Sequence, residues 1–385
     1  MKTRLLQFAI FAQVSACFTT IYLVQPVLPI LQAEFGVSLT QASQSVSMVI
    51  LGVALSTLVF GRLADSLPIK PLIALGCVFV AGSGLACAGV HAIPLFLALR
   101  FLQGLFIPAL TTCLAAYLAR TLPVERLNTV MGAYVAATVA GGLGGRLLGG
   151  WIHPPLHWRY AFVTSALLVF MTTAAALMIL PPEKRQRGST SSGPGYRELV
   201  TSSRLIPLFL VGFGSLFIYG ATFNYLPYYL AAPPFSASTN TITTVYFTYL
   251  IGVVVAPASG RISNRCGNGF TMLLGLGLMG LGLGISRAPW MAAVVLGLSL
   301  LCAGFFAVHT AAVGAMNRSL TESRGRANSL YILWYYLGGS CGITVMGWAW
   351  QHAAWNGVLV VGFAMLFILA AIALWEKRLE RTGRL

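Results

Sequence analysis

The sequence predicts an all-α membrane protein with twelve transmembrane helices, arranged as two pseudo-symmetric six-helix bundles around a central cavity. Hydrophobic residues make up 57% of the chain and charged residues 8%, whereas a soluble domain has roughly 25% charged residues. Mean hydropathy is +0.82. Apolar stretches of about 20 residues, long enough to cross a bilayer, recur along the whole chain.

The apolar stretches divide into two sets of six. We expect spans at residues 5–31, 42–62, 71–90, 93–119, 127–150, 158–180, 205–231, 240–260, 269–286, 288–316, 327–350 and 355–375. Residues 181–204 are rich in Ser, Gly, Pro and basic residues and form the predicted cytoplasmic linker. The predicted domains are therefore an N-terminal bundle, 1–180, and a C-terminal bundle, 205–385. Other connections are short, so neighbouring spans must be antiparallel.

The net charge of +16 has a distribution typical of a membrane protein. Arg159 and Arg287 fall on one side of the predicted membrane, and Arg100 and Arg146 lie inside spans. All other Lys and Arg residues fall on the opposite side. The positive-inside rule assigns that side, with both termini, to the cytoplasm. The charge is thereby explained without a nucleic-acid partner.

Polar and aromatic side chains concentrate on one face of particular spans. The third, sixth, ninth and twelfth spans are nearly all aliphatic, Gly or Ala, whereas the first, fourth, seventh, tenth and eleventh carry polar or aromatic stripes. Such stripes suit a cavity for a partly apolar, drug-sized molecule. The predicted substrate-binding residues are Tyr22, Gln25, Gln103, Asn224, Tyr228, Phe306, His309 and Tyr335. For the seventh and eleventh spans, helix packing is the alternative interpretation.

Three motifs carry a family resemblance. Residues 61–70, GRLADSLPIK, resemble the first signature of the major facilitator superfamily, G-x-L-a-D-(R/K)-x-G-(R/K)-(R/K), with Ser66, Pro68 and Ile69 as departures. Residues 100–104, RFLQG, match its R-x-x-Q-G signature. Residues 260–267, GRISNRCG, are similar to a degenerate second copy of the first signature. The resemblance implies the superfamily fold and transport by alternating access.

A closer resemblance extends over most of the chain, to the YnfM-like, or acriflavine-sensitivity, branch of drug:proton antiporters. The segments that carry it are 22–29, 141–146, 158–159, 223–225, 303–309, 329–338 and 355–357. It implies efflux driven by proton influx across the bacterial inner (cytoplasmic) membrane. The antiporter signature of the fifth span is altered, because Arg146 stands where Pro is common. Gly141 to Gly145 favours close helix packing over substrate contact.

Gating is expected at the loop after the second span. The resemblance implies that Gly61, Asp65 and Lys70 take part, with Asp65 as a cytoplasmic latch that pairs with basic loop residues or a helix N-terminus. The alternative is that Asp65 is an ordinary solvated carboxylate.

Proton coupling is harder to assign, because no acidic residue falls deep in a predicted span. The acids are Glu34, Asp65, Glu125, Glu183, Glu198, Glu322, Glu376 and Glu380. His309, in the middle of the tenth span, is the first candidate because imidazole titrates near neutral pH. Arg100 and Arg146 would oppose its protonation, and Glu34 is the second candidate. A neutral His309 that only hydrogen-bonds is the alternative.

Two other functional classes remain. An uptake permease or uniporter for a small metabolite has the same fold. A membrane receptor or enzyme is disfavoured, because the chain lacks a soluble domain and a catalytic constellation. The expected partners are a small-molecule substrate, protons and the lipid bilayer, and we expect a monomer. The sequence suggests neither a cofactor nor a metal site, and it does not name the cargo.

Overall fold

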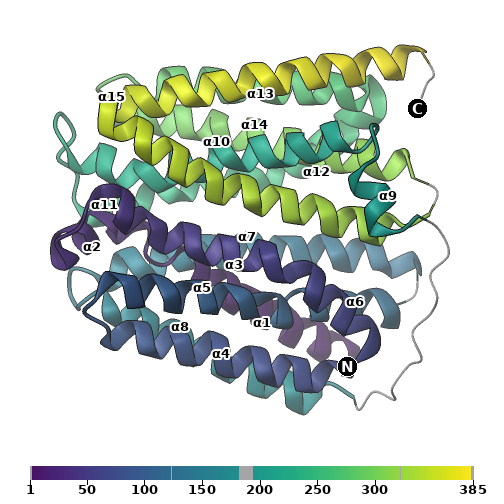
Figure 1. Ribbon diagram of the computed structural model, residues 1–385, viewed down its shortest axis with the longest axis horizontal. Coiled ribbons are helices and arrows are strands. Elements are labelled where there is room, and N and C mark those ends of the chain that lie inside the picture. The colour runs from purple at the N-terminus through teal and green to yellow at the C-terminus, as the bar shows by residue number, and fades with distance from the viewer. Residues whose placement is uncertain (1, 123, 182–193, 321, 383–385) are drawn as a thin grey trace. The chain divides into compact units, whose positions relative to one another are not determined.

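The computed structural model describes residues 2–122, 124–181, 194–320 and 322–382, which form helices joined by turns and loops and contain no strand (Figure 1). Contacts divide the chain into two compact units, each described here by itself. Unit 1 comprises Met1–Thr190 and Ser238–Tyr246, and unit 2 comprises Ser191–Ala237 and Phe247–Leu385. Half of the predicted linker, residues 182–193, lies outside the described residues. The predicted domain boundaries remain a prediction.

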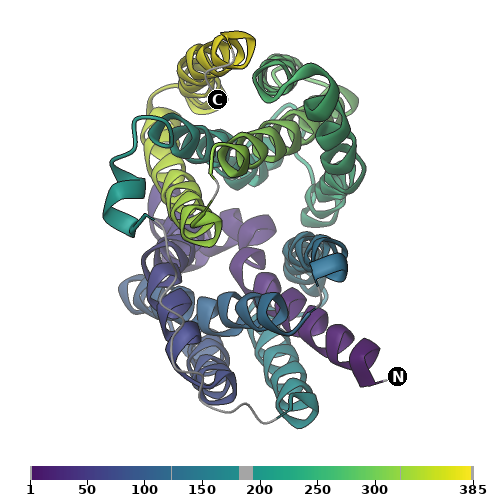
Figure 2. The same cartoon turned by 90° about the vertical axis from the view of Figure 1, so that its right-hand side faces the viewer.

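The helices of each unit run along a common direction and are seen end-on in Figure 2. Unit 1 contains α1 (Lys2–Tyr22), η1 (Gln25–Val27), α2 (Leu28–Phe35), α3 (Leu39–Ser66), α4 (Ile69–Gly89), α5 (Ile93–Leu110), α6 (Thr112–Thr121), α7 (Val124–Ile152), α8 (Arg159–Ile179) and α11 (Thr239–Val245). Unit 2 contains α9 (Tyr196–Val200), α10 (Ile206–Ala231), α12 (Ile251–Cys266), α13 (Asn268–Ile285), α14 (Met291–Arg318) and α15 (Arg324–Thr382). The 3-10 helix η2 (Tyr246–Leu250) joins α11 to α12.

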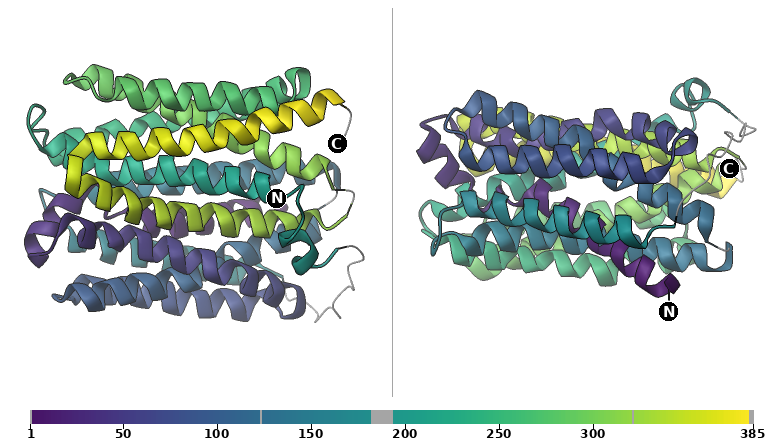
Figure 3. Two further views of the ribbon diagram at one scale, coloured as in Figure 1. Left: turned by 45° about the horizontal axis from the view of Figure 1, so that its top comes forward. Right: turned by 90° about the horizontal axis from the view of Figure 1, so that it is seen from below.

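The predicted fold class is confirmed. Ten described helical segments are long and apolar enough to cross a membrane, and one of them, α15, supplies two passes because it folds back on itself. The 29-residue α7, which packs against α1, completes the twelve. The reversal of α15 lies at Ala353 and Ala354, whose backbone angles are not helical, and is plain in Figures 1 and 3.

Two predicted continuous spans are broken in the structure. The first span consists of α1, η1 and α2, and the break contains Pro26, which has no backbone N–H to continue the helix. The fourth span divides at Thr111 into α5 and α6, three residues after Pro108. The sequence patterns alone predicted both as single helices.

A glycine stripe on α7 lets it approach α1 closely. Side-chain β carbons added at Gly141, Gly145 and Gly149 would lie 2.3, 2.3 and 1.7 Å from the carbonyl oxygens of Ser15, Thr19 and Leu23, respectively. Only glycine permits this approach, so the structure supports the packing interpretation of the glycine run.

Unit 2 repeats this construction. A β carbon at Gly338 or Gly342 of α15 would lie 2.0 or 2.3 Å from the carbonyl oxygen of Phe213 or Phe217 of α10. The other helix pairs also correspond, since α3 packs on α5 as α12 packs on α14, and α4 packs on α8 as α13 packs on α15. The two units are therefore built on one internal repeat.

Adjacent glycines of α7 provide a test of this packing. We expect Gly145→Ala to destabilise the protein by about 1–3 kcal/mol, because its methyl group would collide with the backbone of α1. Gly144→Ala is the matched control, since its β carbon would lie 3.8 Å from the nearest atom, Thr19 Oγ1. Thermal unfolding in detergent compares the two variants, and equal melting temperatures would contradict the close packing.

Candidate functional site

Arg100 joins three helices around the break in the first span. Its guanidinium is fully buried and donates to the carbonyl oxygens of Thr20, Ile21 and Ser45 at 2.8, 2.7 and 2.9 Å. Thr20 and Ile21 belong to the last turn of α1, whose carbonyls lose their intrahelical partners where the helix ends. Arg100 therefore supplies the hydrogen bonds that the broken helix lacks.

Gln103 belongs to the same hydrogen-bond network as Arg100. Its Oε1 accepts from Arg100 Nη1, and its Nε2 donates to the carbonyl oxygen of Val80 on α4 at 3.0 Å. Gly104 lets α5 meet α3, because a β carbon there would lie 2.2 Å from the Val49 carbonyl oxygen. The conspicuous residues of the RFLQG motif thus hold α1, α3, α4 and α5 together.

Arg146 of α7 lies on the other side of the same break. Its Nε donates to Gln25 Oε1 at 2.7 Å, and its Nη1 donates to the Gly142 carbonyl oxygen at 2.7 Å. The guanidinium lies 3.9 Å from the Tyr22 ring centroid and 5.4 Å from that of Tyr246. The structure thus brings together Tyr22, Gln25 and Arg146, three of the predicted site residues, and adds Tyr246.

The surroundings of Arg146 contain no acidic side chain from the helices that supply these contacts. Neither α1, η1 nor residues 238–246 include Asp or Glu, and the only acid of α7, Glu125, is in its first turn. The cluster of Tyr22, Gln25, Arg146 and Tyr246 is therefore a buried cationic site made with amide, carbonyl and aromatic groups. Such a site favours an anionic or neutral polar group over a cation.

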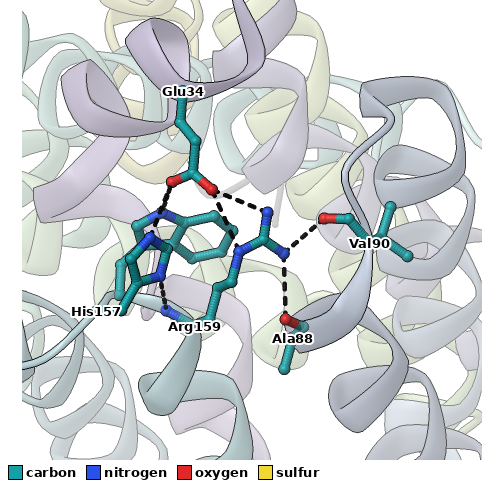
Figure 4. Close-up of polar contacts among 6 residues, drawn as sticks. Glu34, Ala88, Val90, His157 and Arg159 are labelled. Atoms are coloured by element: carbon teal, nitrogen blue, oxygen red, sulfur yellow. Dashed lines mark hydrogen bonds and ion pairs between the residues drawn. The ribbon is translucent and has the colours of Figure 1, made fainter.

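Glu34, the second proton-coupling candidate, is held in a network at one end of unit 1 (Figure 4). Its Oε1 accepts from Arg159 Nε and Nη2 at 3.2 and 2.9 Å, and its Oε2 contacts Trp158 Nε1 and His157 Nε2. Arg159 Nη1 also donates to the carbonyl oxygens of Ala88 and Val90. This network fastens α2 to the start of α8 and the end of α4.

In unit 2, His309 lies among aromatic rings. Its Nδ1 is 3.1 Å from the Tyr331 hydroxyl, and its ring centroid is 5.1 to 6.0 Å from those of Tyr331, Tyr335 and Phe305. Phe305 also stacks on Tyr219 of α10 at 3.9 Å. Phe306 covers Gly252 of α12, where a β carbon would lie 2.1 Å from its ring. The predicted residues Phe306, His309 and Tyr335 thus share one aromatic region.

Asn224 is fully buried in α10, and neither Oδ1 nor Nδ2 has a hydrogen-bond partner among the described residues. A buried amide without partners is costly, which makes it a candidate ligand contact. Tyr228, one turn later, is buried with its ring 6.3 Å from those of Tyr225 and Trp350. These two predicted residues lie on α10, while His309 and Phe306 lie on α14.

The predicted gating residues lie around the α3–α4 turn. Asp65 is exposed at the end of α3, Lys70 is half-buried in the first turn of α4, and a β carbon on Gly61 would just touch Thr112 of α6.

Comparison with known proteins establishes the family. The model of the Major Facilitator Superfamily matches residues 10–283 and 232–384. The chain belongs to the major facilitator superfamily.

Relatives and solved structures agree with this membership. The inner membrane transport protein YnfM of Escherichia coli K12 is 30% identical, covering 97% of this chain and 90% of YnfM. The uncharacterized transporter YybF of Bacillus subtilis is 28% identical, covering 97% and 92%. The crystal structure of the nucleoside transporter NupG has a TM-score of 0.76 at 14% identity, covering 97% of this chain and 99% of NupG. The last likeness shows the fold alone.

Three residues that contact the predicted site residues or a half-buried arginine were not among the residues predicted from the sequence. Tyr246 and Tyr331 contact Arg146 and His309, and only their aromatic character marked them. Glu376 was placed beyond the last span, but α15 continues to Thr382, and Glu376 is buried against Arg204, with Nη2 to Oε1 at 2.7 Å. The two members of each pair lie on different segments of the chain, so their contact could not be predicted from sequence spacing.

Arg100→Lys tests the role of the guanidinium. A single ammonium cannot donate to three separate carbonyls in the geometry that the planar guanidinium provides, so we expect a loss of about 2 kcal/mol. Thermal unfolding in detergent measures the effect, with Arg265→Lys, at an exposed position of α12, as control. Equal stability of the two variants would show that Arg100 does not hold the break.

Proposed function

We propose that this superfamily member exports a small molecule across the bacterial inner membrane by alternating access of its two halves, in exchange for protons. Its relatives support transport, and its similarity to the inner membrane protein YnfM supports the location. Both termini are cytoplasmic in this proposal, as the distribution of Lys and Arg favours.

The observation that carries the proposal is the buried amide of Asn224 on α10, which has no hydrogen-bond partner among the described residues. The same unit holds the aromatic rings around His309. We assign substrate binding to Tyr22, Gln25, Asn224, Tyr228, Phe306, His309 and Tyr335. Gln103 acts instead through Arg100 and Val80, because both ends of its amide are engaged. Aromatic faces bind an apolar body, and amides and hydroxyls orient its polar groups.

His309 is the proposed proton carrier. Glu34 is engaged by Arg159 and Glu376 by Arg204, so each carboxylate already has a fixed cationic partner. Arg100 and Arg146 place two buried guanidinium groups in unit 1. Imidazole is the side chain that changes charge most easily near neutral pH.

Asp65, with Gly61 and Lys70, is the proposed cytoplasmic latch. Its exposed position at the end of α3 leaves the carboxylate accessible to basic loop residues when the transporter changes conformation.

Substitutions on α10 test the binding site. We expect Asn224→Ala or Tyr228→Ala to weaken cargo binding roughly tenfold or more, since each removes a polar contact that orients the cargo. Leu369→Ala, at a buried position of α15 in the twelfth span, controls for lost packing. A thermal-shift screen in detergent first identifies a cargo, whose affinity is then titrated. Equal effects of all three substitutions would defeat the assignment.

Proton coupling is tested in proteoliposomes with an imposed pH gradient. We expect His309→Gln to abolish accumulation of the cargo against its gradient while preserving counterflow, because exchange without net proton movement needs no titrating group. Glu34→Gln should keep pH-driven transport.

If Glu34→Gln abolished accumulation of the cargo and His309→Gln kept it, the role of proton carrier would pass to Glu34. If both variants still accumulated the cargo against its gradient, neither residue would carry the proton. A proton-sensitive dye provides the second readout. Cargo movement by the wild-type protein without any proton signal would identify a uniporter or uncoupled permease instead.

A further inference from the structure

A pocket of about 300 Å³ opens in unit 2 beside the reversal of α15. Tyr229, Trp350 and Trp355 form its aromatic wall, and the exposed Arg287 lies at its edge. Tyr229 and Trp355 stack at 4.3 Å between ring centroids with an interplanar angle of 5°. The Tyr229 hydroxyl donates to the carbonyl oxygen of Ser286 at 3.1 Å, and Trp355 Nε1 donates to Ser286 Oγ at 3.3 Å.

These contacts fix the positions of the two aromatic rings in the pocket wall. Both polar aromatic groups donate to Ser286, the residue that precedes Arg287, so the two rings are held beside the segment that carries Arg287. Ala353 and Ala354, the two residues at which α15 reverses, also line the pocket, together with Ala232, Pro233 and Asn356. The pocket is separate from the aromatic region around His309.

No acidic residue occurs in the described segments of unit 2 that surround this pocket. The segments that line it, and the helices that lead to them, contain no Asp or Glu between residues 205 and 320 or between residues 323 and 375. Arg159, the other basic residue predicted for the same side of the membrane, is paired with Glu34. Arg287 therefore gives this end of unit 2 a net positive charge that attracts an anion.

The setting is that of a membrane interface. Trp290 and Trp348, which lie close in sequence to Arg287 and Trp350, are 71% and 63% exposed. Exposed Trp at the end of a transmembrane helix typically lies at the level of lipid headgroups. Arginine binds phosphate bidentately, and apolar rings beside it suit the glycerol and first acyl carbons.

We propose that this pocket binds the headgroup of an anionic phospholipid such as phosphatidylglycerol, with the phosphate on Arg287. A zwitterionic lipid is disfavoured because its ammonium finds no carboxylate there. The site is independent of the direction of transport and of the proton carrier.

Native mass spectrometry of the full-length protein in detergent, titrated with phosphatidylglycerol or phosphatidylethanolamine, tests the proposal. We expect tighter binding of phosphatidylglycerol and a roughly tenfold loss of its affinity in Arg287→Gln, because the charge-assisted phosphate contact is removed. Arg287→Lys should retain part of the affinity. Arg265→Gln, the same charge change at an exposed position of α12, should bind as the wild type does.

Three results would overturn the proposal. They are equal phosphatidylglycerol binding by Arg287→Gln and wild type, equal affinity for the two lipids, and displacement of phosphatidylglycerol by glycerol phosphate at similar concentrations. The last would assign the pocket to a soluble anion. Cargo binding and transport are measured separately, so failure here leaves the proposed function standing.

Discussion

The guanidinium of Arg100 is the contact on which the architecture of unit 1 depends. The first span is interrupted at Pro26, and an interrupted helix inside a membrane exposes carbonyl groups that lipid cannot satisfy. Arg100 meets this need with hydrogen bonds to Thr20, Ile21 and Ser45, and these bonds also satisfy its own buried charge. The broken helix and the buried cation are each costly alone and stabilise one another.

The two units share a packing plan but differ in chemistry. In each unit, a stripe of glycines lets two helices approach closely. These pairs are α7 with α1 and α15 with α10. Unit 1 places fixed cations beside its stripe, with Arg146 against Tyr22 and Gln25. Unit 2 instead places aromatic rings and the imidazole of His309 on the helices next to its stripe. In our proposal, an internal repeat therefore carries charge recognition in one half and proton exchange in the other.

Three of the described carboxylates fasten helix ends. Glu34 joins α2 to α8, and Glu376 joins α15 to Arg204 ahead of α10. Glu380 accepts from the backbone N–H groups of Asn268 and Gly269 at 2.7 and 3.1 Å, which caps the start of α13. Each of these carboxylates holds elements distant in sequence in a fixed relation. Because these carboxylates are already engaged, we propose a histidine as the proton carrier.

The sequence by itself determined the twelve spans, the likeness of the two halves and the family, because hydrophobic length and short signatures are local properties of the chain. It also marked Tyr22, Gln25 and Arg146 as polar residues of predicted spans, without showing that they meet. Only the tertiary structure decided which carbonyls Arg100 binds, that Gln103 is engaged through it, and that Tyr331 faces His309. These contacts join residues of different helices, and the crossing of those helices is set by close packing at glycines such as Gly104 and Gly145. Helical periodicity places a side chain on a face, but the helix that meets that face is chosen by the packing of the whole unit.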